Sequence, residues 1–356
     1  MKMEIPGFIG VHVGAGKYSE ASAPTYEKLC RTACKKGIEI LKSGGTALEA
    51  ATYATAILED ASITNAGFGS NLTIDGNVEC DASVMDGSTL RYGAVGALSG
   101  VKNPVLLAKK LCCNQSEPME LGRIPPCVLV GHGAYDYAQH CSDIITVHPE
   151  SLVSKNALKL HTKYMRQLGS RNFDAEDVKC DRLDTVGAVA IDGKGHTSAA
   201  CSSGGILLKH SGRVGQAAMY GCGCWAEDGS QGNAGVAVTT SGCGEHIMKA
   251  MLARDIAGVM SKPTTMPCVT LNESMNKCFL ESNFLRNIDE KLCGMLVIRW
   301  NGEDGEFLWA HTTPALCIGY MNTNSKKAKS RLSCLPATAQ AGKTVVVEGI
   351  SMSEMN

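Results

Sequence analysis

Residues 181–195 read DRLDTVGAVAIDGKG, and in this stretch an Asp184–Thr185 step stands directly before a run of small and β-branched residues. Val186, Gly187 and the alternation that follows them predict a strand rather than a helix, and the Asp-Gly pair predicts a hairpin turn. A polar start to a strand is ordinary in itself. The position of this one is informative, because a segment that we expect to form a helix and then a mobile linker (149–184) leads into it, and a rigid hairpin follows it.

The elements on either side predict a layered α+β domain. Thr46 and Glu49 form a capping-box signature at the start of one helix. Periodicity predicts helices in 26–41, 46–58, 103–111 and 271–282. It predicts single strands in 7–16, 92–98 and 127–131, three strands in 292–321, and a short final strand in 344–350. Mixed units are predicted in 72–87 (strand, turn, strand) and in 235–260 (strand, turn, helix). This order lacks a regular βαβ alternation and favours antiparallel sheets covered by helices.

Composition sets the broad class of the protein. The chain has 356 residues, of which 44% are hydrophobic and 19% charged, and its formal net charge is −1, so we expect a globular protein without a nucleic-acid surface. It contains no apolar run long enough to span a membrane and no export signal at its start. The seventeen cysteines are odd in number and irregularly spaced. These features predict reduced thiols in a protein of the cytoplasm or nucleus, not a secreted or membrane-bound one.

Familiar cofactor and nucleophile motifs are missing. Lys17 follows Gly16, but the remaining spacing of a phosphate loop fails, and the glycines from Gly14 onward do not fit a dinucleotide fingerprint. The chain has no G-x-S-x-G, so an α/β-hydrolase serine mechanism has no support, and no H-E-x-x-H, so we expect no catalytic metal. We also expect no organic cofactor. Glu245 and His246 are expected to open a helix and to stabilise its N-terminus.

Thr185 offers a different chemistry. A threonine hydroxyl is a weak nucleophile unless a base removes its proton, and a threonine at a chain terminus can use its own α-amine for this purpose. That amine has an ordinary pKa of about 7.7–8, so a useful fraction is neutral near pH 7. It becomes free only if the peptide bond between Asp184 and Thr185 is cut.

Several blocks of the chain match one known family, in the same order: VHVGAG (11–16), TNAGFGSNL (64–72), LDTVGAV (183–189), GRVGQAA (212–218) and TSGCGEH (240–246). They resemble the type-2 asparaginase family of N-terminal nucleophile hydrolases. Within that family, CDASVMDG (80–87) and GRIPPC (122–127) resemble the threonine aspartase (taspase) branch. The resemblance implies one four-layer αββα domain, made as a precursor that cuts itself into an α subunit (1–184) and a β subunit (185–356).

The resemblance also implies site residues. Thr185 would be the nucleophile, with Ser203 hydrogen-bonded to it, and Asp184 would precede the self-cleaved bond. The family's oxyanion stabilisers match Ser241 and the backbone N–H of Gly242. The residues matched to substrate binding are Arg213, which would grip a carboxylate, and Gln216, Asn65, Gly14 and Gly244.

Gln216 bears on the substrate. Small-molecule asparaginases usually carry an aspartate here that holds the substrate's α-ammonium, whereas Gln216 is neutral. We therefore predict an autoprocessed threonine endopeptidase that cuts polypeptides after aspartate, such as nuclear regulatory proteins, and we expect αβ units to self-associate as dimers. The alternative is an L-asparaginase or isoaspartyl dipeptidase. A third possibility is a non-enzymatic binding module, against which the intact Thr185 and Arg213 argue.

Overall fold

The computed structural model describes residues 6–168 and 184–352, and two stacked sheets between two helical layers form its frame. The larger sheet contains, in spatial order, β12 (Lys329–Cys334), β11 (Ala315–Asn322), β1 (Phe8–Gly16), β5 (Val186–Ile191), β6 (Thr197–Ser203), β2 (Cys80–Asp86), β3 (Arg91–Leu98) and β4 (Val128–Val130). The smaller contains β13 (Val346–Ser351), β10 (Gly305–His311), β9 (Cys293–Trp300), β8 (Gly235–Gly242) and β7 (Cys224–Glu227). In the described part of the chain, neighbouring strands of both sheets pair antiparallel, except β3 with β4, which pair parallel.

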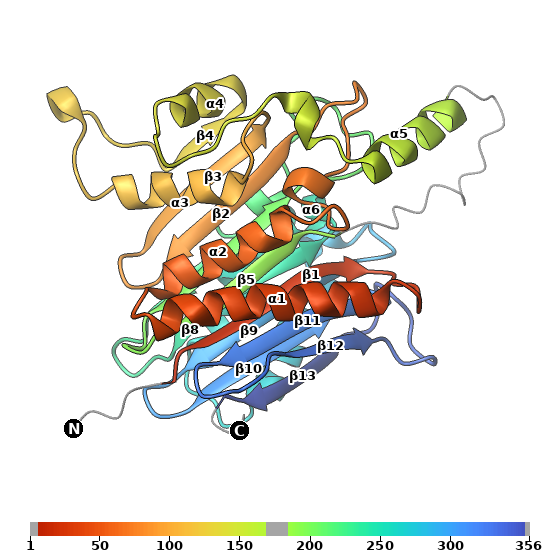
Figure 1. The fold of residues 1–356 in the computed structure, drawn as a ribbon. Coiled ribbons are helices and arrows are strands. Elements are labelled where there is room, and N and C mark those ends of the chain that lie inside the picture. The colour runs from red at the N-terminus through yellow and green to blue at the C-terminus, as the bar shows by residue number, and fades with distance from the viewer. Residues whose placement is uncertain (1–5, 169–183, 353–356) are drawn as a thin grey trace.

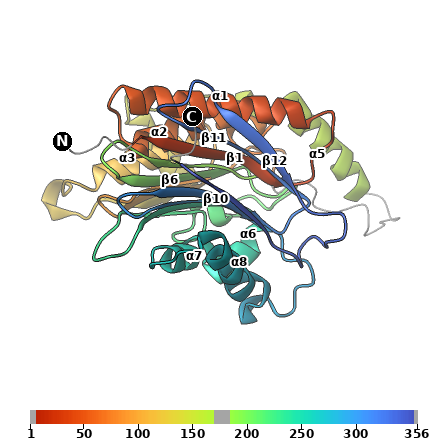
Figure 2. The same ribbon diagram turned by 90° about the horizontal axis from the view of Figure 1, so that it is seen from below.

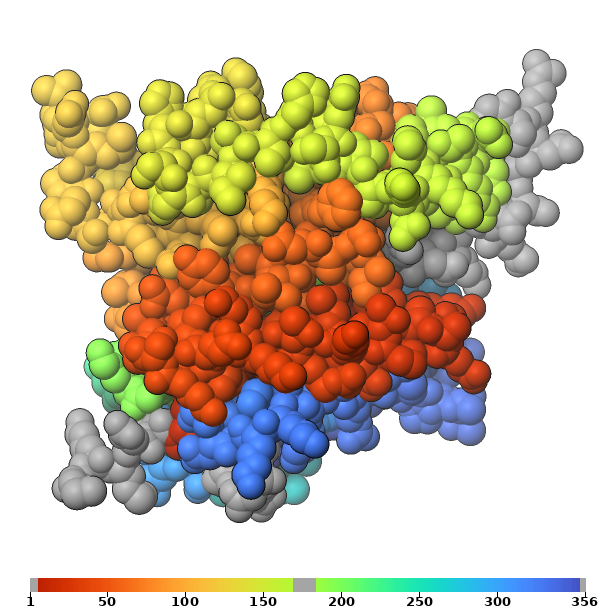
Figure 3. All heavy atoms as spheres, viewed as in Figure 1, coloured from red at the N-terminus to blue at the C-terminus, as the bar shows by residue number. Residues whose placement is uncertain are grey.

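Helices cover both outer faces of this sandwich (Figures 1 and 2). The larger sheet is covered by α1 (Ala23–Lys42), α2 (Ala47–Glu59) and α3 (Pro104–Asn114), and in Figure 3 the red and orange atoms of α1 and α2 form a continuous layer over it. The smaller sheet is covered by α6 (Gly244–Ala250), α7 (Leu252–Met260) and α8 (Pro267–Met275). Two further helices are α4 (Gly131–Gln139) and α5 (Lys155–Leu168). The predicted αββα arrangement is confirmed.

Strand β5 lies inside the larger sheet, between β1 and β6, and all six of its residues are buried. Ala188 and Ala190 belong to the core under α1 and α2, whereas Val189 and Ile191 belong to the core between the two sheets. Gly187 is required here, because a Cβ on it would lie 2.1 Å from Thr239 Oγ1 and 2.7 Å from His12 Nε2. The strand that begins at Thr185 is therefore fixed from both faces.

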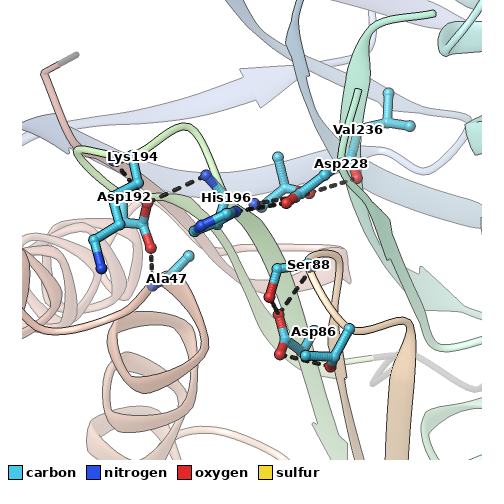
Figure 4. A network of polar contacts seen from close by, with 10 residues as sticks. Ala47, Asp86, Ser88, Asp192, Lys194, His196, Asp228 and Val236 are labelled. Carbon is cyan, nitrogen blue, oxygen red and sulfur yellow. Dashed lines mark hydrogen bonds and ion pairs between the residues drawn. The ribbon is translucent and has the colours of Figure 1, made fainter. Parts of the chain in front are cut away.

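The turn at the far end of β5 is also fixed (Figure 4). One oxygen of Asp192 accepts the backbone N–H groups of Lys194 and His196, at 2.9 and 3.1 Å, and the other accepts the Ala47 N–H at the start of α2, at 3.2 Å. His196 Nδ1 lies 2.7 Å from Asp228 Oδ2, on the loop after β7. These contacts tie the hairpin to a helix on one side and to the smaller sheet on the other, which restrains the strand that carries Thr185.

Some elements differ from the sequence-based expectations. The helix predicted within 235–260 is two helices, because Met251 adopts a positive φ of 45° between α6 and α7. The first strand predicted in 72–87 is only an isolated bridge between Leu72 and Val78, and β12 lies in a stretch where no strand was predicted. In the segment 149–184, the predicted helix is α5, whereas residues 169–183, on which the predicted linker falls, lie outside the described part of the chain. Within the described residues, no helix is both long and apolar enough to cross a membrane.

A buried carboxyl group links the helical layer to the sheet. Glu59, at the end of α2, is fully buried, and its Oε1 accepts the Ser202 hydroxyl at 2.6 Å and the Val105 N–H at 3.0 Å. Burial raises the pKa of Glu59 to about 8, although these hydrogen bonds lower it in part. The side chain is therefore mostly protonated at neutral pH.

This pKa shift predicts a pH-dependent stability. The folded-state pKa exceeds the unfolded value, so the stabilisation is complete below about pH 4.5 and is lost as the pH rises towards 8. Between pH 5.5 and 8.5 the free energy of unfolding should fall by about 3 kcal/mol relative to Glu59→Gln. Denaturant titrations of uncut Thr185→Ala chains can measure this, with the exposed Glu117→Gln as the matched control. Parallel pH profiles for wild-type Glu59 and Glu59→Gln would contradict the prediction.

Candidate active site

Thr185 lies immediately before β5 and is only 3% exposed. Its hydroxyl donates a hydrogen bond to Ser203 Oγ, at the end of β6, over 3.1 Å. The same oxygen accepts a hydrogen bond from Gln216 Nε2 at 3.0 Å. Because both neighbours are neutral and buried, the hydroxyl is held in one orientation without an ionised group in direct contact with it.

Ser203 is held by the glycine pair that follows it. Its Oγ accepts the Gly205 N–H at 3.0 Å. The Gly205 carbonyl in turn accepts the side-chain amides of Asn65 and Asn71, at 2.8 and 2.9 Å. Asn65 Oδ1 also accepts the backbone N–H of Asn71. Asn65 therefore shapes the loop beside Thr185, and Asn71 is a member of this network that the sequence did not reveal.

Arg213 forms a two-pronged ion pair with Glu245. Its Nε and Nη2 lie 3.0 and 2.7 Å from Glu245 Oε1, and Nη2 lies 2.8 Å from Oε2. The arginine side chain is 15% exposed and that of the glutamate 46%. Glu245 is indeed in the first turn of α6, as expected, but its carboxylate is committed to Arg213. One edge of the guanidinium is thereby fixed, while Nη1 lies near Gly205 and Gly215.

Asp184 packs against the glycine turn at the end of β1. Gly14 has a φ of +126°, and a Cβ on it would lie 2.5 Å from the Cα of Asp184. Ser241 Oγ accepts the backbone N–H of Ala15 at 3.0 Å and so supports this turn. A side chain at position 14 would therefore displace the residue that precedes Thr185.

Most of the predicted site residues meet around one small cavity. The lining is formed by Asn65, Thr185, Ser203, Gly205, Ile206, Arg213, Gln216, Gly242 and Gly244. The three predicted residues outside this lining, Gly14, Asp184 and Ser241, lie at the adjoining turn. In the continuous chain the cavity has a volume of only about 10 Å³, which is space for about one water molecule. The structure thus brings the residues together, and their individual roles stay predictions.

One further residue, which lies beside Thr185, was missed from the sequence. His12 on β1 is fully buried, and its Nε2 lies 3.3 Å from Thr239 Oγ1. Burial lowers the pKa of His12 to about 3, against an opposing interaction with the Thr185 backbone. A neutral imidazole therefore lies beside Thr185 at physiological pH. Only the pairing of β1 with β5 brings the two residues together, so no local pattern could have revealed this contact.

The donor set does not suit a metal ion. Thr185, Ser203 and Gln216 are neutral oxygen and amide groups, and the charged pair Arg213–Glu245 supplies a cation at the cavity. Within residues 6–168 and 184–352, no group of three or more histidine, cysteine, aspartate or glutamate side chains is arranged to hold a metal. The arrangement is instead suited to a reaction in which a hydroxyl attacks a carbonyl carbon of a substrate that also carries a carboxylate.

Comparison with known proteins identifies the family. The asparaginase family model (Asparaginase_2) matches residues 6–329. An isoaspartyl peptidase/L-asparaginase of Xenopus laevis is 40% identical over 246 residues, which are 69% of this chain and 73% of the relative. The mouse protein of the same name is 39% identical over 222 residues, 62% of each chain. An isoaspartyl peptidase of Escherichia coli K12 is 36% identical over 260 residues, 71% of this chain and 76% of the relative.

These relatives correct the predicted activity. The endopeptidase prediction relied on the neutral Gln216, but the chain is 36–40% identical to proteins named for isoaspartyl peptidase and asparaginase activity. The endopeptidase prediction is therefore wrong. Gln216 has another explanation, because its amide donates to the Thr185 hydroxyl, a contact 31 residues apart that the sequence does not show. From its motifs, its αββα layers and the match over residues 6–329, the chain belongs to the type-2 asparaginase family of N-terminal nucleophile hydrolases.

Proposed function

We propose that this protein cuts itself between Asp184 and Thr185 and then hydrolyses the side-chain amide bond of isoaspartyl dipeptides and of L-asparagine, with Thr185 as the nucleophile. The observation that carries the proposal is the buried Thr185 hydroxyl, hydrogen-bonded to Ser203 and Gln216 in a cavity that Arg213 also lines. The names of the relatives from Xenopus laevis, mouse and E. coli support the same substrate class.

Maturation requires no outside reagent except water. Thr185 Oγ1 attacks the Asp184 carbonyl carbon, the peptide C–N bond breaks, and the acyl group moves from nitrogen to oxygen. Water then hydrolyses the resulting ester, which leaves a carboxylate on Asp184 and a free hydroxyl and α-amine on Thr185. The close approach of Gly14 to Asp184 restrains the reacting carbonyl.

The two fragments are expected to stay together after this cut. In the larger sheet, β1 lies between β11 and β5, and β2 is paired with β6. Residues 1–184 therefore contribute strands on both sides of the β5–β6 hairpin of the second fragment. Separation would break these ladders and expose the core between the layers.

The mature site would then work as a threonine with its own base. The neutral α-amine takes the proton of Oγ1, which attacks the side-chain carbonyl of the substrate. Ser241 and the backbone N–H of Gly242 would stabilise the developing oxyanion. The resulting ammonium returns the proton to the leaving amine. The α-amine then takes a proton from water, which hydrolyses the ester and releases aspartate.

Substrate orientation would come from Arg213 and Gln216. The free α-carboxylate of an isoaspartyl residue matches the guanidinium, whose Nη1 lies at Gly205 and Gly215 beside the cavity. The α-ammonium can donate to the amide oxygen of Gln216. This oxygen lies beside Gly244 in the cavity lining, because a Cβ on Gly244 would be 2.6 Å from it. The neutral amide of Gln216 thereby takes the place of the aspartate that small-molecule asparaginases usually carry at this position.

The test is direct. Purified protein should separate into two fragments, the second beginning with Thr185, and should hydrolyse β-Asp-Leu and L-asparagine while leaving α-Asp-Leu intact. Intact-mass analysis and amino-acid release measure both properties. Fully processed protein that hydrolyses neither β-Asp-Leu nor L-asparagine would overturn the proposed activity, and a first residue other than Thr185 would overturn the assigned nucleophile.

A further inference from the structure

A lysine is buried behind the carboxylate-binding arginine. Lys209 is only 2% exposed, and its Nζ donates to the Glu79 carbonyl at 2.7 Å. The backbone around it is fixed, because Ile74 N donates to the Lys209 carbonyl and Leu208 N to that of Leu72. Lysine is rarely buried to this extent without a specific partner for its charge.

The fully buried Asp81 on β2 carries the opposite charge and interacts electrostatically with Lys209. Its Oδ1 accepts the Ala97 N–H at 2.9 Å, and its Oδ2 accepts the Gly215 N–H at 2.8 Å. Burial raises the pKa of Asp81, and the charge of Lys209 is the largest influence that opposes this shift. Lys209 thus favours the ionised form of a carboxylate that holds the loop between Arg213 and Gln216.

Both charges lie close to Arg213. A Cβ on Gly205 would lie 2.8 Å from Arg213 Nη1 and 3.3 Å from Lys209 Nζ. A Cβ on Gly215 would lie 2.7 Å from the same Nη1 and 3.4 Å from Asp81 Oδ2. Asp81 therefore feels the charge of both cations, yet its carboxylate accepts hydrogen bonds from the backbone N–H groups of Ala97 and Gly215, and Arg213 pairs with Glu245.

We propose that Lys209 is a positioning residue for the substrate carboxylate: it balances the charge of Asp81, so that Asp81 anchors the Arg213 loop through Gly215 and does not capture the Arg213 guanidinium. This inference rests on the proposed function, because it assumes that Arg213 binds the substrate carboxylate. Asp81 is also the register partner of Ser203 between β2 and β6, so it neighbours both the Arg213 loop and the strand that carries Ser203.

The physical consequence concerns binding rather than the chemical step. Without the lysine charge, Asp81 would be a buried carboxylate with one nearby cation, Arg213. The guanidinium would be drawn towards it, and Nη1 would no longer be available to the substrate. Replacing Asp81 by asparagine as well would remove the competing charge, while the amide oxygen can still accept the Gly215 N–H, so Arg213 would be released again.

The experiment uses processed wild-type protein and the variants Lys209→Met, Asp81→Asn, Lys209→Met/Asp81→Asn and Lys209→Arg. Methionine keeps most of the lysine volume without its charge. For β-Asp-Leu, we expect Lys209→Met to raise KM at least tenfold with kcat within threefold, whereas Lys209→Arg and the double variant stay within threefold of wild type in KM. Inhibition by L-aspartate should weaken as KM rises. Inhibition by the α-amide of L-aspartate, which lacks the α-carboxylate charge, should change less than twofold.

Three results would overturn the inference. The first is a KM of Lys209→Met within twofold of wild type, and the second is a double variant as impaired as the single one. The third applies if Lys209→Met alone fails to fold. In that case a KM of the double variant tenfold above that of Asp81→Asn alone would mean that the lysine does not act through Asp81. Wild-type protein that does not hydrolyse β-Asp-Leu overturns the proposed function and this inference together, whereas a normal wild type with an unaffected variant counts against Lys209 alone.

Discussion

A Thr185→Ala chain is expected to remain in one piece and to hydrolyse neither β-Asp-Leu nor L-asparagine. The substitution removes the hydroxyl to which Ser203 and Gln216 are both hydrogen-bonded in the cavity. It abolishes both the acyl shift and the later attack, so activity should fall by at least about 10⁴-fold. Intact-mass analysis after prolonged incubation measures the first effect, and a sensitive aspartate-release assay measures the second.

Thr185→Ser is the matched control for this prediction. Serine retains the hydroxyl but lacks the β-branch that restricts χ1. We expect the serine variant to cut itself more slowly than wild type and to keep measurable hydrolysis. Cleavage at residue 184 in the alanine variant would show that another group performs the cut.

Replacing Arg213 by alanine is expected to reduce kcat/KM for β-Asp-Leu by roughly 100-fold or more, chiefly through KM. The guanidinium is the cation that lines the cavity, and its planar fork is suited to a carboxylate. The fold should survive, because the abandoned partner Glu245 is 46% exposed and can be hydrated. Steady-state kinetics over a wide range of substrate concentration separate the two parameters.

Two further variants sharpen this prediction. Arg213→Lys keeps the charge but not the fork, and we expect it to recover only a small part of the loss. Arg331→Ala breaks another arginine–glutamate pair, with Glu348 on β13, and should leave KM unchanged. An unchanged KM in Arg213→Ala would mean that the substrate carboxylate is bound elsewhere.

Much of the framework follows from local patterns in the sequence. The capping box of Thr46 and Glu49 is present at α2, and the strands at both ends of the chain lie where periodicity placed them. The break at Met251 was missed, because a positive φ in a non-glycine residue has no simple local signal. The short edge strand β12 was also missed, since its polar residues resemble a loop until a neighbouring strand pairs with them.

The sequence by itself determined that Thr185 begins a buried strand and which blocks accompany it, because strand, turn and cap preferences act between near neighbours. Only the tertiary structure decided what each of these residues touches. Gln216 meets Thr185 across 31 residues, Glu245 meets Arg213 across 32, and Gly215 meets Asp81 across 134. Such contacts depend on the order and register of the strands, and the burial that makes them strong exists only once the four layers have packed.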